Sequence, residues 1–427
     1  MRKKKKDKIS VYEDDFMTVS EISKEEPEKT KPPKEEKIKK EKKPKKKESL
    51  KGKSLFKCIL IAVIIGLVIA FSVIDTGFIG DIKDKVSSFF KKEDNITFDS
   101  RIGNTFDHSS KMVPFENAST SQISWSKSGL VVAKSNYLAL FDKSGNTLWD
   151  TNTSVINPIL RTEGDFVLLA EKQGKRICLF KDKKLLFSKE APNDILTAQL
   201  SSNGDIVLVT KKEFYKNAIC VYNEKGEQVF SWSSGTDSII SADISSSSRR
   251  VAASLINTDS RVKSYVMFFD INKTEPYHNI EFTESIVFKT QFIGETLHVV
   301  ADNRITGIET DGEVLWDLTY TDRQLILTEA DEDGNRLTSI EKNNIPSLIV
   351  LDSDADTETT INLDVSPDYA DIKDETLIYN NERIVIFGEP RKLGRYITSM
   401  DIRGLKVTSD ESFVVVYNNS IEFVVTK

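Results

Sequence analysis

The sequence contains few of the residues on which most catalytic and metal-binding chemistry depends. Its 427 residues include 3 His and 3 Cys. The histidines, His108, His278 and His298, lie far apart in the chain, and none belongs to a pair with the spacing of metal ligands. The chain also lacks a Gly-x-Ser-x-Gly motif, a glycine-rich phosphate loop and a Cys-x-x-Cys pair. We therefore expect no catalytic, metal-binding or cofactor-binding residues.

The cysteines give little indication of redox chemistry. Cys58 lies in a long apolar run, and Cys178 and Cys220 occupy corresponding positions in two similar apolar segments. A buried Cys behaves as a small hydrophobic residue, and a disulfide needs two β-carbons within about 4.5 Å. Equivalent positions in successive repeats seldom meet that distance. We expect two free, buried thiols, with a disulfide as the alternative.

Only one hydrophobic run is long enough to cross a membrane. The 17 residues Cys58–Ile74 contain no charge, and Leu55 and Phe56 extend them. An α-helix of about 20 residues spans a hydrocarbon core of about 30 Å, so residues 54–74 are predicted to form a transmembrane helix. A leader of more than 50 residues without a small-residue cleavage site favours an uncleaved signal anchor.

Charge is divided unevenly along the chain. The net charge is −6, to which residues 1–53 contribute +8 and residues 54–427 contribute −14. The Lys/Glu/Pro-rich residues 1–53 contain too little apolar surface to fold, so we expect a disordered tail. The positive-inside rule places this tail in the cytoplasm, beside anionic inner-leaflet lipid, and places everything after Ile74 outside. Interleaved Glu and the absence of aromatic residues from Glu21 to Glu48 argue against nucleic-acid binding.

Residues 75–95 are predicted to form an amphipathic juxtamembrane stalk. Their apolar residues, such as Ile79, Ile82 and Val86, recur at helical spacing, and lysines lie mostly elsewhere. Two interpretations remain open for this segment. It either lies against lipid headgroups or packs on the domain that follows.

An internal repeat dominates the remaining residues, 96–427. Apolar segments end in a bulky residue at Phe141, Phe180, Tyr222, Phe269, Ile308, Leu351, Phe387 and Phe423. These eight marker residues recur at a period near 40, which is typical of a repeat architecture. A second apolar run precedes most markers, a shorter alternating piece precedes that run, and a turn and an edge strand follow the marker. Each unit therefore reads as four antiparallel strands.

Four strands per repeat of this length predict a blade of a β-propeller. A lone four-stranded sheet cannot bury both faces, whereas radial stacking buries both. We expect an all-β fold with a single propeller over residues 96–427, of about eight blades, with seven as the alternative. The eighth unit ends at its third strand, SIEFVVTK. Its fourth strand is expected from KMVPFEN at 111–117 or, as the second choice, from NITFDS at 95–100.

Two strand–turn–strand segments resemble the repeat of quinoprotein-type eight-bladed propellers. Ala139, Gly145 and Trp149 keep the small-residue, Gly and Trp spacing of that repeat, and Gly312 and Trp316 keep its last two positions. In that family the Trp packs flat against the glycine turn of the adjacent blade. The Trp is replaced elsewhere in this chain by Phe or Tyr. We assign these five residues a structural role in the blades.

The combination of basic tail, single anchor and outer propeller also resembles a family of membrane-anchored propeller proteins from low-GC Gram-positive bacteria. That resemblance implies a fold and a location, and it brings no established activity. A true quinoprotein enzyme needs a calcium ion held by Glu and Asn or Asp, and many carry adjacent disulfide-bonded cysteines. The acidic segments Asp352–Leu363 and Glu329–Ile340 lack the terminal Glu of a calcium loop, so we interpret both as turns.

These observations predict a non-catalytic interaction or scaffold module on the outer side of the bacterial cell membrane. Its expected partners are envelope proteins or wall components, and its acidic outer domain favours basic or neutral ones. The alternatives are a ligand-sensing receptor domain and, as a third choice, a quinoprotein-type oxidoreductase. The sequence identifies neither the partner nor the face that binds it.

Overall fold

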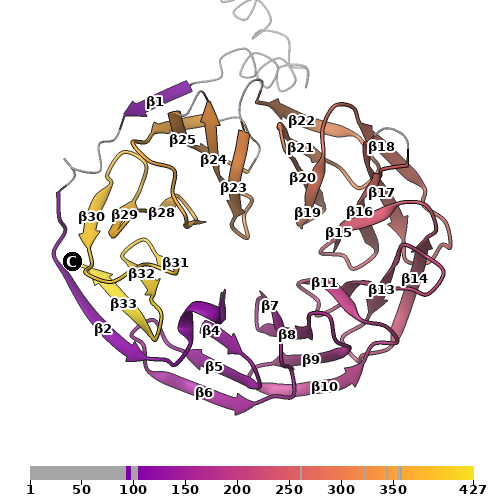
Figure 1. Ribbon diagram of the computed structural model, residues 1–427, viewed down its shortest axis with the longest axis horizontal. Coiled ribbons are helices and arrows are strands. Elements are labelled where there is room, and N and C mark those ends of the chain that lie inside the picture. The colour runs from indigo at the N-terminus through magenta and orange to yellow at the C-terminus, as the bar shows by residue number, and fades with distance from the viewer. Residues whose placement is uncertain are drawn as a thin grey trace, which may run out of the picture. The chain divides into compact units, whose positions relative to one another are not determined.

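Eight sheets, seven of four strands and one of five, surround a central axis in the computed structural model (Figure 1). The structure describes residues 93–97, 104–259, 262–320, 324–342, 345–353, 355 and 358–427. The predicted eight-bladed propeller is confirmed, and the seven-bladed alternative is wrong. Among the described residues, no helix combines the length and the apolar character needed to cross a membrane. The predicted tail, the predicted transmembrane helix and the predicted stalk up to Lys92 lie outside the described residues.

Blades 1 to 4 follow one another along the chain. Blade 1 comprises β3 (Gln122–Ser126), β4 (Gly129–Lys134), β5 (Tyr137–Phe141) and β6 (Thr147–Asn152). Blade 2 comprises β7 (Pro158–Glu163), β8 (Phe166–Glu171), β9 (Arg176–Lys181) and β10 (Lys184–Glu190). Blade 3 comprises β11 (Ile195–Leu200), β12 (Ile206–Thr210), β13 (Asn217–Tyr222) and β14 (Gln228–Ser234). Blade 4 comprises β15 (Ser238–Ile244), β16 (Arg250–Asn257), β17 (Lys263–Asp270) and β18 (His278–Phe282).

Blades 5 to 8 complete the ring. Blade 5 comprises β19 (Val287–Ile293), β20 (Thr296–Ala301), β21 (Arg304–Ile308) and β22 (Val314–Thr319). Blade 6 comprises β23 (Gln324–Ala330), β24 (Arg336–Lys342), β25 (Ile345–Leu351) and β26 (Glu358–Asn362). Blade 7 comprises β27 (Ala370–Lys373), β28 (Thr376–Asn381), β29 (Ile384–Gly388) and β30 (Gly394–Ile397). Blade 8 comprises β31 (Gly404–Ser409), β32 (Ser412–Val416), β33 (Ser420–Thr426) and β2 (His108–Pro114).

The hydrophobic core lies between the blades. Eight clusters of buried apolar residues occur, and each joins two neighbouring blades, so the eight clusters match the eight junctions of the ring. All eight marker residues end the third strands or lie within them and are at most 5% exposed. Complete burial of such a side chain contributes about 1.5–3 kcal/mol, which explains why the marker positions repeat along the sequence.

The two ends of the propeller pair in blade 8. Strand β2 pairs with β33 in antiparallel register from His108 opposite Thr426 to Pro114 opposite Ser420. The predicted closure by residues 111–117 is therefore confirmed, although the strand begins and ends three residues earlier. A short 3₁₀ helix, η1 (Ala118–Thr120), connects β2 to blade 1.

The second candidate for closure forms a different contact. Strand β1 (Glu93–Thr97) pairs in parallel with β26, the outermost strand of blade 6, and gives that sheet a fifth strand. The NITFDS segment therefore does not close the ring. The last three residues of the predicted stalk, Glu93 to Asn95, belong to this strand.

Candidate functional site

The ring has two faces with different connections. Neighbouring strands in a blade are antiparallel, so the turns from the first to the second strand and from the third to the fourth strand lie on one face. We call this the turn face. The connections from the second to the third strand, and from each fourth strand to the next blade, lie on the opposite face, which we call the loop face.

Outside the outermost strands, the large exposed apolar side chains lie at the loop face. Those at the loop face lie in its connections or in strand residues near them: Ile156, Phe214, Tyr215, Ile240, Val262, Ile286, Phe288, Ile326, Ile345, Val365 and Ile397. The others lie on outermost strands at the rim: Met112, Leu148, Leu185, Leu186, Val229, Val314 and Leu315. None lies in a described turn of the turn face. Apolar side chains grouped on one face are typical of an interaction surface.

The turn face is acidic instead. Every turn from a third to a fourth strand in blades 1 to 7 contains Asp or Glu: Asp142, Asp182, Glu224, Glu227, Glu275, Glu309, Asp311, Glu313, Asp352 and Glu389. These side chains are mostly solvated and form local turns, as in the Asp142 carboxylate, which accepts hydrogen bonds from the backbone of Ser144 and Asn146 at 2.9 and 2.8 Å. The two faces therefore offer different chemistry to a partner.

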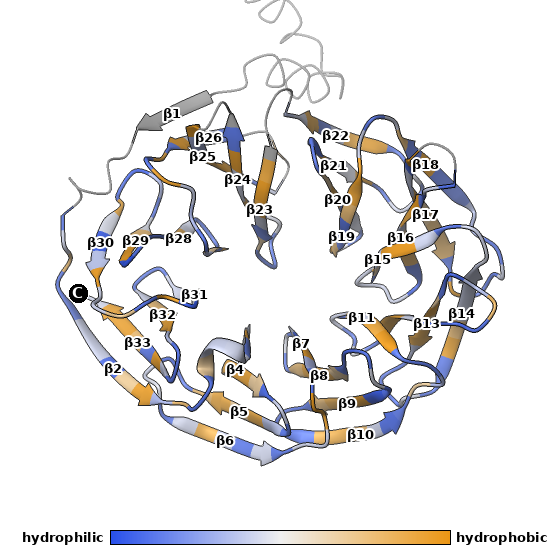
Figure 2. Cartoon of the chain, viewed as in Figure 1, coloured by the Kyte–Doolittle hydropathy of each residue, from blue (hydrophilic) through white to orange (hydrophobic). Residues whose placement is uncertain are grey.

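Four β-bulges place apolar residues at the loop-face end of the central axis. The innermost strands of blades 3 to 6 each skip one residue in their pairing with the second strand, and the skipped residues are Leu196, Ile240, Phe288 and Ile326. We call these four residues the apolar crescent. Ile240, Phe288 and Ile326 are 41%, 41% and 45% exposed, and Leu196 is partly buried against the core. Figure 2 shows the hydrophobic colour along β11 and β23.

The bulges are confined to half of the ring. The innermost strands of blades 1, 2 and 7 pair without a register shift, and the shift in blade 8 lies at the turn-face end, between Val407 and Ser409. A β-bulge redirects a side chain and interrupts the ladder locally. Its repetition at one position of four consecutive blades therefore builds one continuous feature.

Charged side chains gather around the central axis behind the crescent. We call the following residues the axial cluster: Arg161, Glu163, Asp243, Lys289, Glu329, Asp371 and Lys406. They come from the innermost strands of six blades. Arg161 in blade 2 and Glu329 in blade 6 interact electrostatically although their blades lie on opposite sides of the ring. Only the axis brings such strands together, so these side chains surround it.

Several members of the axial cluster also hold neighbouring blades together. The Asp243 carboxylate accepts a hydrogen bond from the Phe292 N–H of the next blade at 2.7 Å. Asp371 accepts one from the Val407 N–H at 2.8 Å and pairs with the Lys406 ammonium at 2.5 Å. The Arg161 guanidinium donates to the Gln199 side chain at 2.5 Å. Part of this charge therefore has a structural role at the inner ends of the blade junctions.

Two carboxyl groups in the cluster titrate near neutral pH. Burial raises the pKa of Asp243 to about 7, although backbone hydrogen bonds and nearby Arg161 favour its charged form. Burial, assisted by the nearby Glu332 carboxylate, raises the pKa of Glu163 to about 7. Desolvation disfavours a charge in this way. At neutral pH these two acids are therefore only partly ionised.

A buried arginine lies between blades 5 and 6. Arg336 is 1% exposed and donates hydrogen bonds to the Thr328 hydroxyl at 2.9 Å and to His298 Nδ1 at 3.2 Å. Burial, together with the Arg336 charge, lowers the pKa of His298 to about 3, so this imidazole is neutral and can accept the bond. His298 therefore serves as a packed hydrogen-bond acceptor. His108 and His278 lie on separate outermost strands, and each is exposed.

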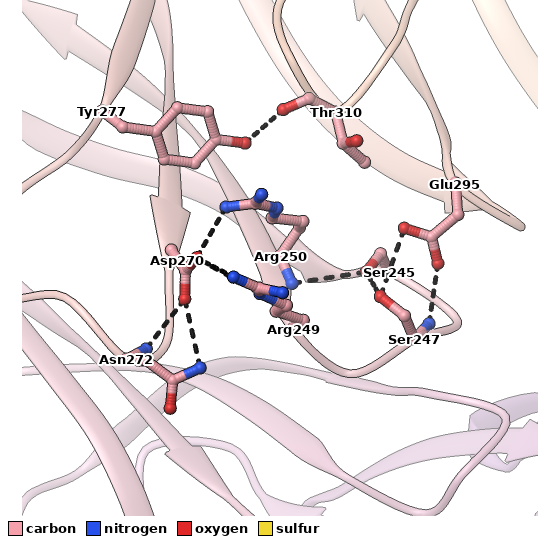
Figure 3. Close-up of polar contacts among 9 residues, drawn as sticks. All are labelled: Ser245, Ser247, Arg249, Arg250, Asp270, Asn272, Tyr277, Glu295 and Thr310. Carbon is pink, nitrogen blue, oxygen red and sulfur yellow. Dashed lines mark hydrogen bonds and ion pairs between the residues drawn. The ribbon is translucent and has the colours of Figure 1, made fainter.

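A polar network at the turn face joins blades 4 and 5 (Figure 3). Asp270 is 1% exposed and accepts hydrogen bonds from Arg249 and Arg250, the closest at 2.8 Å from Arg250. The Glu295 carboxylate of blade 5 accepts hydrogen bonds from the Ser247 N–H at 2.7 Å and from the Ser247 hydroxyl. A serine run that the sequence leaves without a role thus forms part of a blade junction.

One open pocket lies on blade 4 near the loop face. Its volume is about 400 Å³, and its lining includes Asp237, Asn257, Lys263, Tyr265 and Glu281. Although burial alone would raise the pKa of Asp237, hydrogen bonds from Tyr265, Thr236 and Asn257 lower it. The lining is polar and carries more carboxylates than ammonium groups. This pocket can therefore hold a small polar molecule.

The five residues assigned to the blades make varied contacts. Trp149 on β6 packs at 5.6 Å, edge to face, against Phe180 of the next blade. The next turn, Asp182–Lys183, contains no glycine on which Trp149 could lie. Ala139 is fully buried in the core of blade 1. The expected packing of an aromatic ring on the next glycine turn occurs instead at Phe187, whose ring meets Gly226.

The two glycines of the motif pack against the preceding blade. Gly145 has φ +74°, and a Cβ there would lie 2.6 Å from the Phe423 ring of blade 8. Gly312 has φ +95° and leaves no room for a Cβ beside His278 of blade 4. Trp316 covers Gly307 of its own blade and lies 5.1 Å from the His298 ring.

The acidic segment that the sequence suggests as a turn and the two cysteine thiols have structural roles. In the Glu329–Ile340 segment the Asp331 carboxylate caps its own turn by accepting hydrogen bonds from the Asp333, Gly334 and Asn335 N–H groups. Within the described residues, no three His, Cys, Asp or Glu side chains are grouped so as to hold a metal ion. Cys178 and Cys220 are free and buried, as expected.

Sequence analysis did not identify the axial cluster or the crescent. The signal was present in the first strands, where charged residues such as Arg161 and Lys289 interrupt segments that otherwise alternate. Each strand taken alone reads as half-buried. The axial cluster forms only when the innermost strands of six blades meet around one axis.

Comparisons with known proteins support the fold. BamB from Moraxella catarrhalis matches with a TM-score of 0.51 and 10% identity, over 75% of this chain and 100% of that chain. The C-terminal WD40 domain of Sif2 gives 0.56 and 12%, over 76% of this chain and 99% of that chain. The computationally designed protein Ika8 gives 0.54 and 13%, over 76% and 98%. A likeness at such identities shows the fold alone.

The sequence comparisons give a family without an activity. A search of curated proteins finds no match. The model of one protein family, described as a family of unknown function, matches residues 105–425. This match covers the ring from just before β2 to the end of β33.

Proposed function

The chain belongs to the family of unknown function DUF5711, and we propose that its propeller is a non-catalytic protein-interaction module of the cell envelope. The observation that carries this proposal is the difference between the two faces. Large exposed apolar side chains lie at the loop face and the rim, whereas the described turns of the turn face carry acidic side chains. A rigid ring whose loop face carries exposed apolar side chains is suited to holding a partner.

We further propose that residues 54–74 anchor the ring on the outer side of the membrane. The uncharged run and the lysine-rich residues before it support this location. The register of the first described strands is compatible with it. Glu93 pairs with Glu358 and His108 pairs with Thr426, so both strands begin at the turn-face end of a blade. The chain therefore enters the ring at the turn face, which leaves the loop face open.

One observation favours the receptor alternative. The pocket on blade 4 has a volume of about 400 Å³, within the usual range for small-molecule sites of about 300–1,000 Å³. Its lining is largely polar, and Asp237 and Glu281 would favour a cationic or hydroxylated ligand. A receptor of this kind would need a recruited cytoplasmic partner, because the predicted tail contains no output domain.

Photo-crosslinking in cells tests the interaction module. A crosslinking amino acid would replace Phe214 or Ile345 at the loop face, and Lys183 at the turn face would serve as the matched control. We expect one defined protein to be captured from both loop-face positions and absent from the turn-face position. Equal capture from both faces, or none from either, would contradict the proposal. Capture of glycans or small molecules alone would favour the receptor.

A further inference from the structure

The apolar crescent lies at one end of the axis and has no apolar counterpart across it. Ile240, Phe288 and Ile326 keep 41–45% of their surface exposed, although each belongs to an innermost strand. On the opposite half of the ring, the second residues of the innermost strands are Ile123, which is partly buried, and Ile159, Asp371 and Leu405, which are buried. The crescent is therefore a one-sided apolar surface, and four separate bulges are needed to build it.

The residue that follows Phe288 of the crescent carries an ammonium group. Lys289 follows Phe288 on β19 and is largely enclosed by protein, and burial lowers its pKa. Among the described residues, no carboxylate lies within 4.0 Å of its ammonium group. The Glu329 carboxylate acts on it electrostatically and also interacts with Arg161 and Lys406. One carboxylate is thus shared among several cations.

The remaining charges near this group are already paired, positive or only partly ionised. Lys406 is already paired with Asp371, and Arg336 adds a further buried positive charge near Lys289. The two other acids of the axial cluster, Asp243 and Glu163, are only partly ionised at neutral pH. The charges of the axial cluster are therefore close to balance, and the Lys289 ammonium has no ion-pair partner of its own among the described residues.

We propose that the loop-face end of the axis binds a protein segment that lays apolar side chains on the crescent and directs one carboxylate to the Lys289 ammonium. A small anion would not use four apolar side chains supplied by four blades. An anionic bilayer is disfavoured because residues 54–427 carry a net charge of −14. The site deepens the proposed function, on which it rests, by naming the chemistry of the partner.

Selection from a random peptide library tests the chemistry without knowledge of the partner. The probe is a phage-displayed library of nine-residue peptides, and the bait is the full-length protein in detergent. We expect enrichment of peptides with one Asp or Glu flanked by Leu, Ile or Phe. A triple variant, Ile240→Ser with Phe288→Ser and Ile326→Ser, is expected to lose this enrichment. All three side chains are exposed, so the ring should still fold, which a melting curve checks.

A matched pair of peptides then tests the ammonium group. An enriched peptide and its Glu→Gln version would be titrated against the wild type and the Lys289→Gln variant. We expect the wild type to prefer the acidic peptide about tenfold and Lys289→Gln to show no preference. Ile397→Ser, at the same face on an outermost strand, is the control and should bind as the wild type does.

Three results would overturn the inference. They are equal enrichment on the triple variant, enrichment of basic peptides, and an acid preference that survives Lys289→Gln. Competition by acetate at the concentration of the peptide would also count against it, because it would show a small-anion site. Any of these results could occur while crosslinking from Phe214 still captures a partner. The proposed interaction module would then be retained, and only the proposed site at the axis would be wrong.

Discussion

At the scale of single residues, the repeat consists of positions where burial restricts which residue types fit. The eight markers are large and apolar because each fills a blade junction. The glycines of the turns are equally constrained, because Gly145 combines a positive φ with contact to a neighbouring ring. Such positions could be read from the sequence. The contacts of Trp149 could not, since they depend on whether the next blade happens to have a glycine turn.

Replacement of Gly145 separates the two constraints on that residue. Gly145→Ala is expected to lower the free energy of unfolding by about 2–4 kcal/mol, because backbone strain of about 1 kcal/mol adds to overpacking against Phe423 of about 1–3 kcal/mol. Gly164→Ala is the matched control, since Gly164 also has a positive φ but no atom within 4 Å of the added Cβ. Urea unfolding of both variants measures the difference. Equal losses would show that packing on Phe423 is unimportant.

The raised pKa of Asp243 predicts a pH dependence of stability. Its folded pKa of about 7 exceeds the ordinary value of 3.8, so the folded state holds this proton more tightly than the unfolded state does. This contribution to stability is therefore full below about pH 4 and is lost as the pH rises toward 7. A shift of this size corresponds to at most about 4 kcal/mol.

Asp243→Asn should remove that dependence. The amide oxygen can still accept the Phe292 N–H bond and does not ionise, so we expect a higher melting temperature than the wild type at pH 8 and a similar one at pH 4. Asp371→Asn is the contrast, because it leaves the Lys406 ammonium without its partner and should destabilise the ring at neutral pH. A wild-type advantage at pH 8 over Asp243→Asn would contradict the assigned pKa.

At the scale of strands, the order and number of elements could be predicted because each strand carries its own signal. Alternating or continuous apolar segments, bounded by Gly and Asp turns, mark all four strands of most blades. Strand pairing between distant segments carries a weaker signal. The closing strand β2 was found because one blade lacked a fourth strand, whereas the pairing of β1 with β26 has no counterpart in the repeat. The bulges were not found because the two successive apolar residues that mark each one, as in Ile239-Ile240, also occur in strands that are buried on both faces.

Truncations distinguish the roles of the two N-terminal strands. A protein that begins at Asn104 loses β1 and keeps the closed ring, so its melting temperature should match that of the full outer domain. A protein that begins at Glu116 loses β2, exposes the edge of β33, and should melt far lower and digest readily. Removal of Ser420–Lys427 should have the same effect from the other end. An unchanged protease resistance in either of the last two proteins would refute closure by the termini.

At the scale of the whole molecule, the ring is a disc whose faces differ in chemistry. This polarity follows from assembly, since a blade contributes at most one residue to the crescent and at most two to the axial cluster. It was therefore beyond prediction from the repeat, which treats all blades alike. The division into a basic tail, an anchor and an acidic outer domain stays a prediction from the sequence, and the orientation that we propose rests on it.

Protease treatment of intact, wall-stripped cells checks the orientation. We expect digestion of the propeller in a destabilised variant such as the one lacking Ser420–Lys427, and retention of the tail of residues 1–53 inside the cell. An antibody against each segment reads the result. The matched control is the same treatment after lysis, in which the tail should also be lost. Survival of the outer domain in intact cells, with its loss after lysis, would place it in the cytoplasm.

The antiparallel pairing of β2 with β33 also governs how the ring responds to mechanical force. A pull along the strand direction, applied through the chain before His108, would load seven residue pairs at once in shear, from His108–Thr426 to Pro114–Ser420. A pull directed outward from the rim would instead peel those pairs apart one at a time, beginning at His108. The ring should therefore resist tension along β2, which runs along the rim in Figure 1, better than tension directed outward from the rim.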